Sequence, residues 1–170
     1  MALLSIIVAP DPRLKVKCDP VIEVTEKHRK ILDDMLETMY DAPGIGLAAP
    51  QIGVTERMIV VDVSKNDNEL MPYQMINPEI TYASDELFDY EEGCLSLPEQ
   101  YAQVTRPEKI HVTYIDPAGV SQKLEASGIL ATCIQHEMDH LEGILFVDHI
   151  SRLRRDLIIR KLKKYKAAQD

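Results

Sequence analysis

The segment "HEMDH", residues 136–140, places two histidines four positions apart with a glutamate directly after the first. On a helix this spacing puts both imidazoles on one face, where they can bind one ion, and Glu137 lies beside them within reach of a water on that ion. The alternative interpretation is two helix histidines that make only hydrogen bonds. The complete five-residue pattern favours a metal site, but two histidines leave the third protein ligand to be found.

Downstream residues offer few candidates for that third ligand. If the pattern continued as HExxHxxGxxH, a third histidine would follow, but Phe146 stands there and cannot bind a metal. No glutamate follows Glu142, which itself lies two residues after His140 and therefore on the wrong helix face. Asp148 and His149 remain as downstream candidates, although no pattern around them supports that role.

The strongest upstream candidate is Cys94, in the turn-like segment "YEEGCLSLPEQ". A cysteine beside Gly93 in a polar turn can present its sulfur, and a thiol that coordinates a metal loses its proton. A cysteine taken alone is more often buried and inert, so the histidine pair without a partner is what favours metal binding here. Cys18 and Cys133 are weaker candidates, and Cys133, three residues before His136, is expected to form a pocket wall.

A second candidate segment is "PGIGLAAPQIG", residues 43–53. Its Gly-x-Gly-x-x-Ala spacing from Gly44 matches a dinucleotide fingerprint, but it follows a predicted helix, and Pro50 prevents a helix from starting where a phosphate would need one. We therefore expect no nucleotide cofactor. A plain glycine-rich turn is the ordinary interpretation. The functional one is a backbone edge at Gly46 that pairs with an extended peptide and ends at the Gln51 amide.

Hydrophobic periodicity predicts the elements that position these segments. We expect strands at residues 2–9 and 57–63, a hairpin formed by residues 109–115 and 120–126, a helix over residues 30–40, a helix capped by Ser127 that runs to about Leu141, and a last helix capped by Ser151. Antiparallel strands with a few helices, without regular βαβ alternation, indicate an α+β fold. No repeat or linker divides the chain, so one domain over residues 1–170 is expected.

Composition and charge narrow the function classes. The 170 residues are 45% hydrophobic and 28% charged, as in ordinary globular domains, and we expect neither a signal peptide nor a membrane partner. Three cysteines without an export signal suggest a reducing compartment. Residues 151–170 carry eight basic and two acidic side chains, a charge of +6, which leaves −15 on the other 150 residues. A solvated surface helix with one core-facing stripe (Leu153, Leu157, Leu162 and Tyr165) explains this segment as well as contact with nucleic-acid phosphates does.

Three segments in this order, "GIGLAAPQ" (44–51), "EGCLS" (92–96) and "HEMDH" (136–140), resemble bacterial-type peptide deformylase, and the likeness extends from "PDPRL" through the last helix. The resemblance implies a single catalytic α+β domain with antiparallel sheets around a central helix that carries both histidines, followed by the basic C-terminal helix. It also implies a hydrolase of the bacterial cytoplasm that removes the N-formyl group from the formylmethionine of newly synthesised polypeptides and releases formate.

The resemblance further implies a role for individual residues. Cys94, His136 and His140 would hold one divalent ion, Fe²⁺ in the cell, with Zn²⁺, Ni²⁺ or Co²⁺ able to take its place. Glu137 would be the acid and base. Gln51 and the backbone N–H of Leu95 would stabilise the oxyanion.

A methionine pocket is expected beside the metal. Ile129 and Cys133 lie on the face of the helix that carries His136, and by resemblance Ile45 and Tyr90 would close the pocket, with the Gly46 backbone alongside. Ile129 could equally be a plain core residue.

Three further points accompany the resemblance. Glu92 and Arg106 are expected to pair and to orient the cysteine loop. Tyr101 stands where many relatives have arginine, which affects substrate contacts but not the chemistry. Two other functions stay open: a metallopeptidase using His149 or Asp148, and a metal-binding or RNA-binding module without activity.

Overall fold

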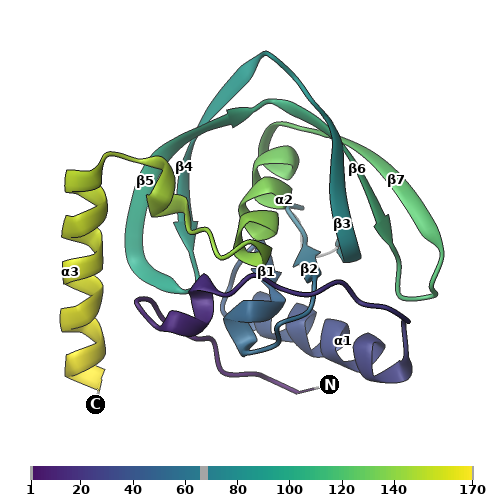
Figure 1. Ribbon diagram of the computed structural model, residues 1–170, viewed down its shortest axis with the longest axis horizontal. Helices are drawn as coiled ribbons and strands as arrows, with labels where there is room; N and C mark the ends of the chain where they lie inside the picture. The colour runs from purple at the N-terminus through teal and green to yellow at the C-terminus, as the bar shows by residue number, and fades with distance from the viewer. Residues whose placement is uncertain (1, 66–68, 170) are drawn as a thin grey trace.

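The computed structural model describes residues 2–65 and 69–169. Two antiparallel sheets lie on either side of one helix, α2, which occupies the centre of the molecule (Figure 1). The helices are α1 (Glu26–Asp41), α2 (Gly128–Leu141) and α3 (Arg152–Gln169), with short 3-10 turns η1 (Pro12–Lys15), η2 (Ala49–Ile52) and η3 (Phe146–His149). The predicted α+β class, with the histidines on a central helix and a C-terminal helix, is confirmed.

The larger sheet has the strand order β1-β2-β3-β6-β7, with every neighbouring pair antiparallel. Its strands are β1 (Gly46–Ala48), β2 (Met58–Val61), β3 (Tyr73–Ala83), β6 (Lys109–Ile115) and β7 (Ser121–Ser127). The smaller sheet pairs β4 (Leu87–Cys94) with β5 (Leu97–Pro107). The predicted strand at residues 57–63 and the predicted hairpin are therefore present, and β1 lies at an edge of its sheet.

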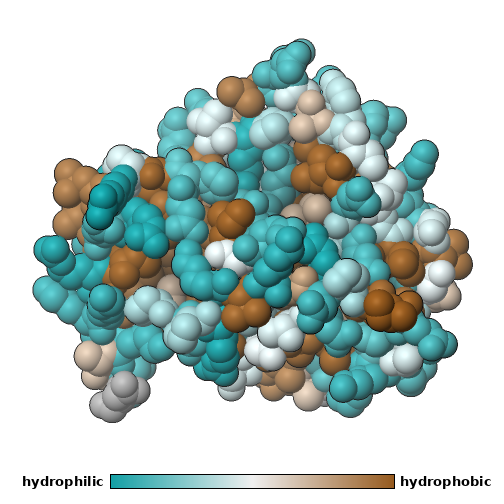
Figure 2. Space-filling view, in the orientation of Figure 1, coloured by the Kyte–Doolittle hydropathy of each residue, from teal (hydrophilic) through white to brown (hydrophobic). Residues whose placement is uncertain are grey.

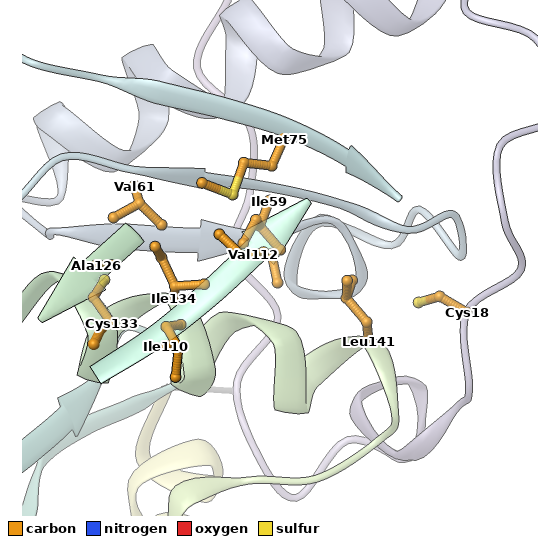
Figure 3. Close-up of a cluster of buried hydrophobic side chains, with 12 residues drawn as sticks. Cys18, Ile59, Val61, Met75, Ile110, Val112, Ala126, Cys133, Ile134 and Leu141 are labelled. Atoms are coloured by element: carbon orange, nitrogen blue, oxygen red, sulfur yellow. The ribbon is translucent and has the colours of Figure 1, made fainter. Parts of the chain in front are cut away.

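The continuous apolar run of β2 is explained by helices on both faces of the sheet. Side chains alternate along a strand, so Met58 and Val60 join the cluster that includes α1, whereas Ile59 and Val61 join the cluster that includes α2. Figure 3 shows Ile134 of α2 among the side chains of the second cluster. A third cluster joins the N-terminal segment, β5, η3 and α3. The central helix is thus held by side chains from both sheets.

The predicted N-terminal strand is wrong. Residues 2–9 form no strand, although the backbone makes single hydrogen bonds from Ile7 N to Gln51 O (2.7 Å) and from Ala9 N to Ser96 O (2.8 Å). A strand needs successive pairs with one extended neighbour, but Gln51 belongs to a 3-10 turn and Ser96 to a turn between β4 and β5. The apolar sequence is used instead to bury Ile7 and Ala9.

Two predictions about helices need correction. The Ser127 side chain makes no capping hydrogen bond to α2, whereas Ser151 Oγ accepts one from Arg154 N at 3.3 Å, as expected for α3. The predicted core-facing stripe of α3 is only partly right. Leu153 is 72% exposed, and the residues of α3 that are buried are Ile158 and Leu162, because the helix turns that side toward η3 and β5.

Within residues 2–65 and 69–169, none of the helices combines the length and the apolar character that crossing a bilayer requires.

Gly143 ends the turn after α2 and allows the chain to pass closely over residue 15. Its φ is +75°, and a Cβ there would lie 2.5 Å from the Lys15 carbonyl oxygen. Gly119 has a similar φ of +83° but nothing within 4 Å of its would-be Cβ. We expect Gly119→Ala to cost about 1–2 kcal/mol from its backbone conformation alone, and Gly143→Ala about 1–3 kcal/mol more because of the clash.

Denaturant unfolding of both variants at equal metal content measures this difference. Equal losses of unfolding free energy in the two variants would contradict the assigned role of the close contact.

Candidate metal centre and the surrounding cavity

Cys94, His136 and His140 meet at one point between the smaller sheet and α2. One ligand atom from each residue lies within 4.8 Å of the other two, and Cys94 Sγ is 3.3 Å from His140 Nε2. Both histidines are buried and Cys94 is half-buried. Among the described residues this is the group of His, Cys, Asp and Glu side chains that could hold a metal ion.

Local structure presents the three side chains. The helical spacing sets the rings of His136 and His140 5.2 Å apart, centroid to centroid. The β4–β5 pairing shifts register between Gly93 and Cys94, which ends the regular ladder at the cysteine. The ring of Tyr101 lies against Gly93, where a Cβ would be 2.6 Å from Tyr101 Cε1. Tyr101 therefore packs against the glycine that precedes Cys94.

A buried carboxylate orients the first histidine. Glu92 accepts two hydrogen bonds from Arg106 (2.7 and 3.0 Å), and its Oε1 lies 2.9 Å from His136 Nδ1. Burial raises the pKa of Glu92, but the hydrogen bonds from His136 and Arg106 outweigh it and lower the pKa to about 2. Because Glu92 is ionised, Nδ1 of His136 must donate, which leaves Nε2 free to bind an ion. The expected Glu92–Arg106 pair exists, and it holds the His136 ring as well as the cysteine strand.

The same arginine connects the smaller sheet to α2. Arg106 Nη1 donates to Asp139 Oδ2 at 2.8 Å, and His149 Nε2 lies 2.8 Å from that oxygen. His149 is therefore paired with the Asp139 carboxylate of α2. Asp148 is paired with Lys15 and Arg155. Neither downstream candidate belongs to the metal-ligand group.

Glu137 is buried beside the three ligand side chains. Its Oε1 has no hydrogen-bond partner in the described chain, and burial raises its pKa to about 7. The carboxylate fits because residue 46 is glycine: a Cβ there would collide with Glu137 Oε2 and lie 2.8 Å from Cys133 Sγ. A buried, unpartnered carboxyl group that titrates near neutrality is typical of general acid and base residues.

The electrostatics of this group suit a cation. Burial lowers the pKa of His136, but Glu137 and hydrogen bonds to Cys94 and Glu92 raise it more, so the surroundings favour positive charge at that ring. Burial lowers the pKa of His140, and His136 lowers it further, so that ring is neutral, the form that binds metals. The residues present therefore fit a divalent ion.

Gln51 is fixed with its amide nitrogen toward the cysteine. Its Oε1 accepts from Ala48 N at 2.9 Å, and its Nε2 donates to Ser96 Oγ at 2.9 Å and approaches Cys94 Sγ at 3.5 Å. Leu95, the other expected oxyanion residue, lines the cavity next to Cys94. Both candidates lie beside the proposed ligands.

A cavity of about 700 Å³ opens from this centre. It is lined by all the residues expected to bind substrate: Ile45, Gly46, Tyr90, Ile129 and Cys133. Sequence reasoning missed Thr132, which is buried in the cavity wall with a hydroxyl that has no partner among the described residues. Its position four residues before His136 could have revealed it, by the spacing argument that located Ile129. Sequence reasoning also missed Ile6, Val8 and Tyr165, for which no local pattern gave a signal.

The remaining cysteine lies apart from this centre. Cys18 is buried next to Leu141, whose carbonyl accepts its backbone N–H at 2.8 Å, and burial raises the pKa of its thiol to about 11. It packs in the core shown in Figure 3.

Comparisons with known proteins agree with this geometry. The family described as Polypeptide deformylase matches residues 3–156. The peptide deformylase of Methylocella silvestris is 55% identical over 167 residues, covering 96% of this chain and 85% of its own. That of Agrobacterium fabrum is 52% identical over 164 residues, covering 96% of each chain.

Two solved structures are also close. The crystal structure of peptide deformylase from Ehrlichia chaffeensis superposes with a TM-score of 0.94 at 39% identity, covering 99% of each chain. The same enzyme in complex with actinonin gives a TM-score of 0.91 at 41% identity, covering 97% of this chain and 98% of that one.

The hydrogen bond from His136 to Glu92 can be tested through metal affinity. Glu92→Gln keeps the size of the side chain but weakens its hydrogen bond to the His136 ring. It also leaves Arg106 with Asp139 as its one carboxylate partner among the residues that the structure describes. We therefore expect the affinity for Zn²⁺ to fall by about 10–100-fold. Competition with a chelating dye measures this affinity. The exposed Glu86→Gln exchange, in the bend just before β4, is the control and should leave this affinity unchanged. An unaltered affinity in Glu92→Gln would show that Glu92 does not support the metal centre.

Proposed function

Because this chain belongs to the peptide deformylase family, it is a metal-dependent hydrolase that removes the N-formyl group from newly synthesised polypeptides, and we propose which residues carry out that reaction. The observation that carries the proposal is the meeting of Cys94, His136 and His140 beside the unpartnered carboxylate of Glu137. Water attacks the formyl carbon, the C–N bond to methionine breaks, and formate and a free amine leave.

Cys94, His136 and His140 are the proposed ligands of one divalent ion. Their donor atoms converge, and the Glu92 contact leaves His136 Nε2 available. An ion held by these three residues would supply Lewis acidity and a water that is nucleophilic near neutral pH.

Fe²⁺ is the proposed ion in the cell, with Zn²⁺, Ni²⁺ or Co²⁺ as substitutes. One thiolate and two imidazoles are donors that all four ions accept, so cellular supply decides among them. The metal content of protein purified without oxygen tests this assignment.

Glu137 is the proposed acid and base. Its free oxygen is available to take the proton of the attacking water, and its pKa near 7 lets it return that proton to the departing amine. Glu92, the other buried carboxylate near the ligand group, is occupied by Arg106 and His136.

Gln51 and the Leu95 N–H are the proposed donors to the oxyanion. The Gln51 amide is held in place by Ala48 and Ser96 before substrate arrives, so it need not reorganise during the reaction. A preorganised donor of this kind typically contributes about 10²–10³ in rate.

Ile45, Tyr90, Ile129 and Cys133 form the proposed pocket for the methionine side chain, whose flexible thioether suits an irregular apolar wall. The Gly46 backbone belongs to an edge strand of the larger sheet, so one side of it is open to an extended peptide.

Two broader assignments complete the proposal. We propose that residues 1–170 act as a single catalytic domain, since the family match covers most of them and the hydrophobic clusters join distant parts of the chain. We also propose the bacterial cytoplasm as its location, where formylated chains are made and where its free thiols stay reduced.

The basic helix α3 is the proposed contact with ribosomal RNA. It is anchored through Ile158 and Leu162, so its basic side chains project outward, among them Arg160, Lys161, Lys163 and Lys164. The visible face of α3 in Figure 2 carries hydrophilic residues with hydrophobic ones among them. The segment of residues 151–170, with a charge of +6 on a body of −15, is directed toward phosphates by its charge.

Removal of the Glu137 carboxylate tests the catalytic assignment. We expect Glu137→Gln to keep its bound metal, and the rate of formate release from formyl-Met-Ala to fall by about 10²–10⁴-fold. The amide cannot take up and return the proton that the carboxylate transfers. Metal content and formate are measured on the same preparation, with Glu86→Gln as the control. Normal turnover in Glu137→Gln would assign the proton transfer to another group.

Neutralising α3 tests the ribosome contact. The triple exchange of Lys161, Lys163 and Lys164 to Gln should weaken ribosome binding and lower its salt dependence by about one in log–log slope for each lysine that meets a phosphate. Hydrolysis of formyl-Met-Ala should stay unchanged. The same exchange at the exposed Lys27, Lys109 and Lys123 is the control, and equal effects of both triple variants would argue against a specific role of α3.

A further inference from the structure

The cavity at the metal centre extends past the residues that formylmethionine needs. At about 700 Å³ it falls within the range of about 300–1,000 Å³ that encloses whole drug-sized ligands, more than one methionine side chain occupies. Its lining also includes Ile6 and Val8 of the N-terminal segment and Tyr165 of α3.

A second cavity lies next to the first. It measures about 460 Å³ and shares the three lining residues Ile6, Val8 and Tyr165 with the first. Its other lining residues include Lys166 and Gln169 in the C-terminal half of α3, and we call the two neighbouring cavities together the groove. In Figure 1 the purple N-terminal segment passes near the lower half of α3, and Ile7 shares a hydrophobic cluster with Ile158 and Leu162.

The N-terminal segment is fixed directly beside the catalytic residues. Its Ile7 N–H donates to Gln51 O and its Ala9 N–H to Ser96 O, and the Gln51 and Ser96 side chains are themselves hydrogen-bonded next to Cys94. Ile7 and Ala9 are buried, whereas the alternating residues Ile6 and Val8 are half-buried and line the groove. A segment that forms no strand therefore makes an apolar wall that begins at the metal centre.

Helix α3 contributes Tyr165 to the lining of both cavities. Tyr165 is half-buried, and the helix is held against the body by Ile158 and Leu162, so the position of the ring is set by the core. The second cavity adds the apolar side chains Leu4 and Ile52, together with polar and charged ones that include Asp11, Arg13 and Lys166. An aromatic ring facing aliphatic side chains offers apolar contact area and a hydroxyl at the rim.

We propose that this groove binds the polypeptide downstream of formylmethionine, and that Tyr165 selects apolar and aromatic side chains there. The proposal rests on the proposed function, because the groove continues the pocket in which the formylated end would be held. Continuity with that pocket is the reason for choosing the same substrate chain as the occupant. An extended chain advances about 3.3 Å per residue, so a formylated tripeptide ends early and a hexapeptide reaches further along the groove.

Competition between two substrates in one tube tests the proposal. Formyl-Met-Ala-Ser competes with formyl-Met-Ala-Ser-Leu-Ser-Leu, and the two deformylated products are quantified by mass spectrometry with the metal-loaded enzyme. The ratio of their kcat/KM values does not depend on how much of a variant is folded or metal-bound. We expect the wild type to prefer the hexapeptide by about three- to tenfold and to show no such preference for formyl-Met-Ala-Ser-Ser-Ser-Ser.

Variants of Tyr165 assign the effect to the groove. Tyr165→Ala should bring the ratio to about one, whereas Tyr165→Phe should keep it. Leu157→Ala, on a part of the same helix that lines neither cavity, should also keep it. A wild-type ratio near one, or an unchanged ratio in Tyr165→Ala, would overturn the proposal. If neither peptide released formate, the proposed function itself would fail, which is a different result.

Discussion

The buried ion pair between Glu92 and Arg106 is the contact on which the geometry of the site depends. Both side chains are almost fully buried, and such charges persist only when their hydrogen bonds are satisfied. Glu92 lies on β4 two residues before Cys94, Arg106 lies on β5, and their remaining partners, His136 and Asp139, lie on α2. The network therefore fixes the smaller sheet to the helix and sets the sulfur opposite the imidazoles.

The site lies where three parts of the fold meet, and small residues allow them to approach. The edge strand β1 brings Gly46, and the 3-10 turn η2 that follows it brings Gln51. The smaller sheet brings Cys94, and α2 brings the histidines with Glu137. Without a side chain at residue 46, the carboxylate of Glu137 stays close to the edge strand on which the peptide is proposed to lie. Close packing here serves the chemistry, since the same contacts that exclude water raise the pKa of Glu137.

Part of the N-terminal segment packs against α3, and this gives the helix two different sides. Ile158 and Leu162 join the N-terminal segment in one hydrophobic cluster, and Tyr165 faces the groove that continues from the metal centre. The basic side chains point outward. An enzyme that acts on a chain leaving the ribosome could use the outer side to stay near its substrate and the inner side to guide it, and a single rigid helix would couple the two tasks.

Local spacing was enough to predict much of this protein, and distant contacts decided the rest. The i, i+4 histidines, their helix, the hairpin and the cysteine segment follow from short patterns, because the periodicity of a helix or strand sets which side chains share a face. The partner of His136, the side of α3 that is buried, and the irregular path of residues 2–9 could not be predicted in this way. Each depends on which distant segment lies opposite. Glu92 is 44 residues away from His136 in the sequence. Leu153 and Ile158 are both apolar, but Ile158 is the one buried, because its side of α3 packs against β5 and η3. The sequence alone determined the types of the metal ligands and their order along the chain. The tertiary structure decided the distances between these ligands, their charge states and the length of the groove. Those properties arise from burial and from contacts between segments that are far apart in the chain.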